Sequence, residues 1–139
     1  MENEALAAKL AVAAAFAFMA VVLVVCYVNR KKLSDRAMLA AAVLLAVGIP
    51  FLLPHMHDRY FFAADILTLV LAFSAWQLSP AAALCQFASL LGYHAYLKMR
   101  YLLPMRYGSW ALIVVLVMTA ALLLMELGRK NFGDLENRP

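Results

Sequence analysis

Charge is scarce in this 139-residue chain, in which only 14% of the residues are charged and 67% are hydrophobic. A soluble domain carries about 25% charged residues and about 45–50% apolar residues. The surface of a small domain must also be covered, so this excess of apolar side chains cannot all be core. The composition therefore predicts an integral membrane protein. The sequence also has no basic run with interleaved aromatic residues, which argues against nucleic acid as a partner.

Cysteine is rarer still, with two residues in the chain. Cys26 and Cys85 both lie inside apolar runs and lack the spacing of a metal knuckle, so packing is favoured over a disulfide or a metal role. The first four residues, Met-Glu-Asn-Glu, are acidic, whereas a secretory signal peptide opens with positive charge. We therefore interpret the first apolar run as a retained membrane span. The sequence shows no Gly-rich phosphate loop, nucleophile elbow or inverted repeat either.

What the sequence does contain is a series of long apolar runs. No charge occurs between Lys9 and Arg30, and this run is long enough to cross about 30 Å of hydrocarbon as a helix. Hydropathy and the turn at Ser79-Pro80 predict five transmembrane helices, over residues 10–29, 37–54, 60–78, 81–97 and 109–125. We thus expect an all-α integral membrane fold, with a single transmembrane domain over residues 1–128 and a polar cytoplasmic tail over residues 129–139.

The distribution of lysine and arginine predicts the orientation of these spans. With five spans, the first loop and the tail lie on the same side, and we expect that side to be cytoplasmic. Seven of the twelve cations fall there: Arg30, Lys31, Lys32, Arg36, Arg129, Lys130 and Arg138. The N-terminus, the segment around residues 55–60 and the connector over residues 98–108 then face outward. This places the chain in the inner (plasma) membrane as a multi-pass protein.

The predicted outer end is both aromatic and basic. Its cations include three in the connector, Lys98, Arg100 and Arg106. Its aromatic residues are Tyr60, Phe61, Tyr93, Tyr96, Tyr101, Tyr107 and Trp110. Two interpretations remain open: an interfacial belt with snorkelling bases, or a binding site for an anionic lipid head group such as a phosphate on a long isoprenoid.

Polar side chains that could carry chemistry concentrate between the second and third spans. His55, His57 and Asp58 could ligate a divalent metal, but their spacing supports this only weakly, and we expect no metal cofactor. A histidine near an outward cleft could instead serve in acid–base chemistry near neutral pH. A solvated loop in which Asp58 caps the third helix is the structural alternative.

Asp65 lies two turns after Asp58, near the edge of the predicted hydrocarbon region. An ionisable group at that depth normally faces a cavity or a partner. The connector cations are its best-placed partners, so a structural salt bridge and a substrate contact both remain open. His94, near the end of the fourth span, is interpreted as a hydrogen-bonding residue between helices more readily than as a proton carrier.

One segment, His55 to Leu67 ("HMHDRYFFAADIL"), resembles a family pattern. It is similar to the H-x-H-(E/D)-(R/K) segment and following apolar helix in the C-terminal half of GT-C-type membrane glycosyltransferases, including bacterial mannosyltransferase-like proteins. The matching residues are His55, His57, Asp58, Arg59 and Tyr60, with Asp65 less surely. The match covers roughly a tenth of the chain, and the flanking spans agree by hydropathy alone.

The resemblance implies an enzyme that transfers a sugar from a polyprenyl-phosphate donor on the non-cytoplasmic side. It assigns catalytic roles to His55, His57 and Asp58, and substrate contacts to Arg59, Tyr60, Asp65, Lys98, Arg100 and Arg106. The family's catalytic carboxylate lies in an N-terminal half that this chain does not match, so we expect a C-terminal module or truncated form. The alternative is a small non-catalytic membrane subunit or scaffold that docks a larger membrane protein; an ion or solute carrier is a weaker third hypothesis.

Overall fold

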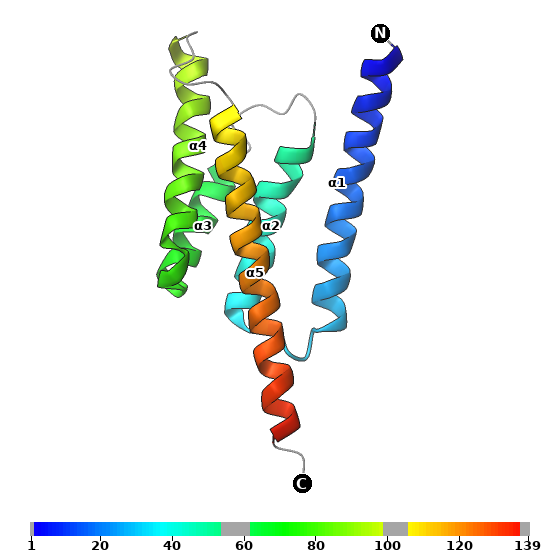
Figure 1. Cartoon of the computed structure of the whole chain (residues 1–139), viewed down its shortest axis with the longest axis vertical. Coiled ribbons are helices and arrows are strands. Elements are labelled where there is room, and N and C mark those ends of the chain that lie inside the picture. Colours follow the sequence, from blue (N-terminus) through cyan, green and yellow to red (C-terminus); the bar gives the residue numbers. More distant parts are fainter. Residues whose placement is uncertain (1, 54–61, 99–105, 137–139) are drawn as a thin grey trace.

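The fold is a bundle of helices in which successive α-helices run in opposite directions (Figure 1). A computed structural model describes residues 2–53, 62–98 and 106–136. These ranges contain five α-helices and one short 3-10 helix, and no strand occurs within them. The five α-helices are the number that hydropathy predicts.

The first two helices begin and end where the sequence changes character. Helix α1 covers Glu2–Val28 and ends just before the basic turn, where the Asn29 side chain donates a hydrogen bond to the Val25 carbonyl at 2.9 Å. Helix α2 covers Asp35–Leu52. Ser34 caps its N-terminus by accepting the Ala37 N–H at 3.2 Å, which satisfies one of the amide donors that a helix start leaves free. Pro50 lies in the last turn of α2, close to where the helix stops.

The third predicted span is divided in the structure. Helix α3 covers only Phe62–Ser74, and a 3-10 helix, η2, follows at Trp76–Leu78. Ala75 separates the two with an extended backbone, and the Leu78 N–H then bonds to the Ala75 carbonyl at 2.8 Å. Helix α4 starts directly afterwards and covers Ser79–Lys98, with a proline at its second position, where the missing N–H costs nothing.

The last helix is longer than the apolar run that it contains. Helix α5 covers Arg106–Glu136, whereas the predicted span covers residues 109–125. Residues such as Glu, Leu, Arg and Lys continue a helix readily, so helical structure carries on after the apolar sequence has ended. In Figure 1 the C-terminal part of α5 extends beyond the other helices.

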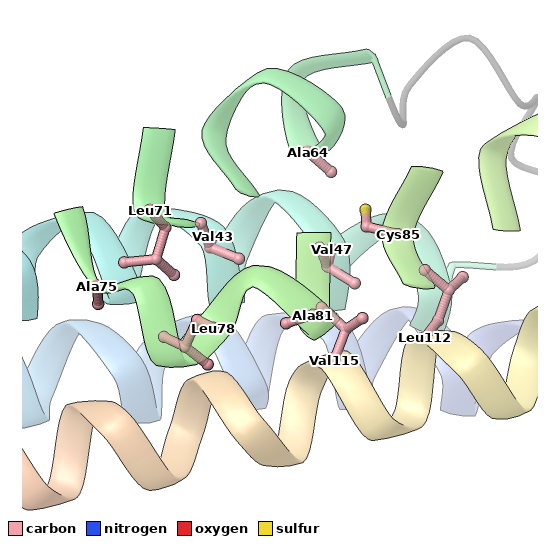
Figure 2. Close-up of a cluster of buried hydrophobic side chains, with 10 residues drawn as sticks. All are labelled: Val43, Val47, Ala64, Leu71, Ala75, Leu78, Ala81, Cys85, Leu112 and Val115. Carbon is pink, nitrogen blue, oxygen red and sulfur yellow. The ribbon is translucent and has the colours of Figure 1, made fainter. Parts of the chain in front are cut away.

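Helices α2 and α5 form the centre of the bundle. They pack against each other, α4 packs on α5, α3 packs on both α2 and α4, and α1 packs chiefly on α2. One core cluster joins α2, α3, α4 and α5, and Figure 2 shows it running along the helices, with Val43 beside Leu71 on one side of the view and Leu112 on the other. A second cluster joins α1, α2 and α5 around Val22, Leu44 and Leu123.

Three of the helices are long and apolar enough to cross a membrane. Within the described residues these are the segments Glu4–Val28, Asp35–Leu52 and Arg106–Arg129. Helix α3 is apolar but has only 13 residues, about 20 Å of helix against a hydrocarbon thickness of about 30 Å. The bundle thus combines these three helices with the short helix α3 and with α4, which at 20 residues is longer than α2 but is not among the three.

Candidate functional site

A buried carboxylate lies at the first turn of α3. Asp65 is 9% exposed, and α2 and α4 both pack against the helix that carries it. A charged residue is seldom buried without a partner, because loss of its hydration must be offset by other contacts. The partners of Asp65 therefore decide what this part of the molecule can do.

Two residues of α4 meet the Asp65 side chain. The Ser89 hydroxyl donates to Oδ1 of Asp65 at 2.7 Å, and the Cys85 Sγ lies 3.6 Å from the same oxygen. Cys85 and Ser89 are four residues apart, so they project from one face of α4. Both are buried, at 0% and 7% exposure. The sequence favoured a cation as the partner of Asp65, whereas its partners within the described residues are uncharged.

The backbone of the same turn is held as well. The Gln86 side chain donates through Nε2 to the Asp65 carbonyl at 3.2 Å. Thr68, 2% exposed, turns its hydroxyl back onto the carbonyls of Ala64 and Asp65, at 2.8 and 3.0 Å. We call Asp65, Thr68, Cys85, Gln86 and Ser89 the Asp65 cluster. Together they fix the start of α3 against the middle of α4.

The Asp65 cluster is a set of polar contacts that hold α3 against α4. It contains a carboxylate acceptor, two hydroxyls, a thiol and an amide, and its contacts join α3 to α4 or the first turn of α3 to itself. Within the described ranges, no three His, Cys, Asp or Glu side chains are grouped so as to hold a metal ion. Cys26 and Cys85 are both free thiols.

The start of α3 shares its end of the bundle with other predicted site elements. The end of α2, the end of α4 at Lys98 and the start of α5 at Arg106 all lie there (Figure 1). The Arg106 guanidinium lies 5.9 Å from the centroid of the Tyr107 ring, and both residues are exposed. Trp110, one turn further along α5, is 65% exposed. This end therefore presents a cation beside aromatic rings, as the sequence predicts.

Several predicted site residues fall outside the described residues. They are His55, His57, Asp58, Arg59, Tyr60 and Arg100. The helices on either side of the first five of these residues are described: α2 ends at Leu52, and α3 begins at Phe62.

His94 lies on α4, nine residues after Cys85, and is half-buried. Its Nδ1 atom is buried and has no hydrogen-bond partner in the part of the chain that the structure describes. The hydrogen bond between helices that the sequence favoured is therefore not formed by this nitrogen within those residues.

Three members of the Asp65 cluster were not anticipated: Thr68, Gln86 and Ser89. A pattern that points to them does exist in the sequence. Thr68 lies three residues after Asp65, and Ser89 lies four after Cys85, so each pair marks a polar stripe on one helix face. What the sequence does not supply is the register that brings the two stripes together.

Comparison with known proteins adds no assignment to this geometry. No protein-family model matches the chain, and no significant match was found among curated proteins or solved structures.

Proposed function

We propose that this chain is the C-terminal membrane module of a glycosyltransferase that takes its sugar from a polyprenyl-phosphate donor. The observation that carries the proposal is the segment "HMHDRYFFAADIL", whose His, Asp, Arg and Tyr pattern resembles that of GT-C-type enzymes. The segment leads into α3, and the first turn of α3 is fastened to α4 through Asp65. A rigid support of this kind is what a site needs to hold side chains in one geometry.

The proposal includes an orientation in the membrane. All five α-helices span the bilayer, the N-terminus faces outward and the C-terminus faces the cytoplasm of a cell whose inner (plasma) membrane holds the protein. Lysine and arginine are more numerous at the predicted cytoplasmic end, by seven to five. The segment that carries His55 and His57 is then on the non-cytoplasmic side, where the resembling family has its active site.

The reaction consists of an acceptor hydroxyl attacking the anomeric carbon of the sugar. The bond between that carbon and the phosphate oxygen breaks, and polyprenyl phosphate leaves. Negative charge builds on the phosphate, so Arg59, Lys98, Arg100 and Arg106 stabilise the transition state. His55, His57 and Asp58 act at the sugar and acceptor, and Tyr60 contacts the donor. The carboxylate that takes the hydroxyl proton comes from another segment or a partner chain, as the family pattern implies.

Asp65 has a different role in this proposal from the substrate contact that the resemblance implies. Its carboxylate is 9% exposed and already accepts a hydrogen bond from Ser89. It acts as a positioning residue, since it holds the start of α3 in place and with it the segment that precedes α3.

The test is donor capture by the chain in bilayers, with turnover in the assembled enzyme. A polyprenyl-phosphate sugar with a photoreactive group should crosslink to the chain, and Arg106→Ala should weaken capture roughly tenfold, as expected for loss of a charged hydrogen bond. His57→Ala should lower turnover while the protein remains folded. His94→Ala removes a histidine from α4 and serves as the matched control. Turnover that is unchanged in His57→Ala contradicts the catalytic assignment.

A non-catalytic membrane subunit is the second candidate function. One observation favours it: α1 packs chiefly on α2, and only 11% of its most apolar 18-residue stretch is buried. Its free face is available to another membrane protein as well as to lipid. Co-purification of a larger membrane protein that depends on this face of α1, together with absence of donor capture, would support the subunit over the enzyme module.

A further inference from the structure

A hollow lies at the opposite end of the bundle from the proposed donor site. It has a volume of about 860 Å³ and lies between the first turn of α2, the turn that joins α3 to α4, and the C-terminal half of α5. In Figure 1, α5 continues past the α3–α4 turn, so the turn does not cover this part of α5. A Cβ atom added at Gly128 would meet nothing within 4 Å, which confirms that the space beside α5 is open.

Two guanidinium groups line this hollow from different helices. Arg36 belongs to the first turn of α2 and Arg129 to α5, and both residues are exposed. The one carboxylate in the lining, Glu126, accepts a hydrogen bond from the Ser34 hydroxyl at 3.2 Å. Neither arginine forms an ion pair with a described residue. The hollow therefore carries a net positive charge and has donors available for an anion.

Ser34 joins the two helices that carry these arginines. Ser34 donates to Glu126 of α5 and accepts the Ala37 N–H of α2 with one hydroxyl. This joins the start of α2 to α5 at the level of the hollow. Arg36 and Arg129 are consequently presented from a braced pair of helices.

The remaining wall is apolar and faces outward. Phe73, Trp76 and Met125 line the hollow and are 85%, 78% and 69% exposed. Side chains of this kind are costly to expose to water but suit contact with acyl chains, and tryptophan favours the depth of the lipid head groups. Gln77 adds an uncharged polar side chain to the lining. The hollow thus has a basic part beside an apolar wall. This arrangement is complementary to a phospholipid, whose phosphate is joined to apolar acyl chains.

We propose that this hollow binds an anionic phospholipid, with the lipid phosphate between Arg36 and Arg129 and the acyl chains along Phe73, Trp76 and Met125. A guanidinium suits phosphate because its parallel N–H groups can donate two bonds to one anion. Arg30 and Lys31 lie at the same end and disfavour a head group that carries its own cation. The site is separate from the proposed donor site and does not depend on the proposed function.

Trp76 gives this site its own reporter. The chain has two tryptophans, Trp76 in the hollow and Trp110 at the other end of the bundle. With Trp110→Phe, the fluorescence of Trp76 can be measured in phosphatidylcholine vesicles that contain a small fraction of bromine-labelled phosphatidylglycerol. We expect quenching well above the mole fraction of the labelled lipid. Labelled phosphatidylcholine at the same fraction should quench only in proportion to its amount.

Matched charge variants separate a site from general attraction to a basic end. Arg36→Gln with Arg129→Gln should lower the preference for phosphatidylglycerol roughly tenfold, since each cation near the surface contributes to binding of anionic lipid. Arg30→Gln with Lys31→Gln removes the same charge from the same end outside the hollow and should largely keep the preference. Trp76→Phe leaves Trp110 as a reporter of the other end, where no preference is expected. Circular dichroism verifies that each variant is folded.

Three results would overturn the proposal. The first is equal quenching of Trp76 by the two labelled lipids. The second is an equal loss of preference in both double variants, which would reduce the effect to surface charge. The third is displacement of the labelled lipid by millimolar inorganic phosphate, which would assign the arginines to a soluble anion.

Discussion

Helix α1 is the longer of two apolar helices and helix α3 the shorter, yet α3 is packed on more sides. Helix α1 has 27 residues and is easily recognised as a membrane span, yet little of it is buried and it packs chiefly on α2. Helix α3 has 13 residues and is too short to meet the same criterion, yet it packs on both α2 and α4. Length and apolar composition therefore identify a helix that could cross a membrane, whereas the packing of a helix depends on which residues interrupt its apolar surface.

The interruptions in α3 are small and polar. Its buried positions are Ala64, Asp65, Thr68, Leu71 and Ala72. Small side chains let helix backbones approach closely, and polar side chains form hydrogen bonds across helices where apolar burial gives no advantage over lipid. Helix α1 is rich in alanine, but its buried residues among those described are only Ala15 and Val22, and neither is polar. The two helices thus predict different sensitivity to mutation.

The largest expected effect is in the core face of α3. Leu71 is 1% exposed and lies in the cluster shown in Figure 2. Leu71→Ala leaves a cavity in the core cluster that joins α3 to its neighbours α2 and α4, and should lower the free energy of unfolding by about 2–4 kcal/mol. Leu69→Ala, on the exposed side of the same helix at 44% exposure, is the control and should change it by less than about 0.5 kcal/mol. Unfolding in mixed micelles measures both, and equal effects would remove the distinction between the faces.

A smaller loss of stability is expected where α1 packs on α2. Gly48 of α2 lies against the ring of Phe18 of α1, so closely that an added Cβ would overlap the ring. Gly48→Leu should force the helices apart at a cost of about 1–3 kcal/mol, because the extra volume has no space. Hydrogen exchange in nanodiscs should rise in α1 while α3 keeps its protection. Gly128→Leu, where the added atoms meet open space, should leave exchange in α1 unchanged.

The smallest loss of stability is expected for variants of the Asp65 cluster. Ser89→Ala removes the 2.7 Å hydrogen bond to Asp65 and should lower the free energy of unfolding by about 0.6 kcal/mol, with an upper bound near 1.7 kcal/mol, as for other hydrogen bonds between membrane helices. Ser74→Ala, at the end of α3, is the matched control and should have no effect.

A related pair of variants tests the charge of Asp65. Asp65→Asn keeps an acceptor oxygen for Ser89 and should lower the free energy of unfolding by less than Asp65→Leu does. An Asn variant as damaging as the Leu variant would indicate that the charge itself is required.

The sequence predicts the elements of this fold better than their boundaries. The apolar runs and the break at Ser79-Pro80 give the five helices, because uninterrupted apolar sequence of that length has few other stable forms in a membrane. The early end of α3 at Ser74 was missed, since Trp76 and Leu78 continue the apolar signal through the 3-10 turn. The length of α5 was missed as well, because helix propensity and not hydropathy governs its last turns.

The candidate site was predictable only in part, for a related reason. Asp65 stands out because it is an acid in apolar sequence, and the structure confirms that it is a buried residue. Its partner Ser89 was not identified, because serine is common in membrane helices and nothing within α4 shows which face meets α3. Contacts within one helix follow from spacing, whereas contacts between helices depend on depth and rotation, which a single sequence does not specify.

The short helix α3 also has a consequence for the membrane around it. Helix α1 offers about 40 Å of helix on one side of the bundle, whereas α3 offers about 20 Å on the other. The outer stripe of α3, Phe62, Ile66, Leu69, Val70 and Phe73, is apolar along its whole length. A bilayer in contact with both helices meets two different hydrophobic thicknesses, and the mismatch is relieved by tilt, by local thinning or by lipid filling the space beneath the shorter element. The protein is thereby expected to sort lipids between its two sides.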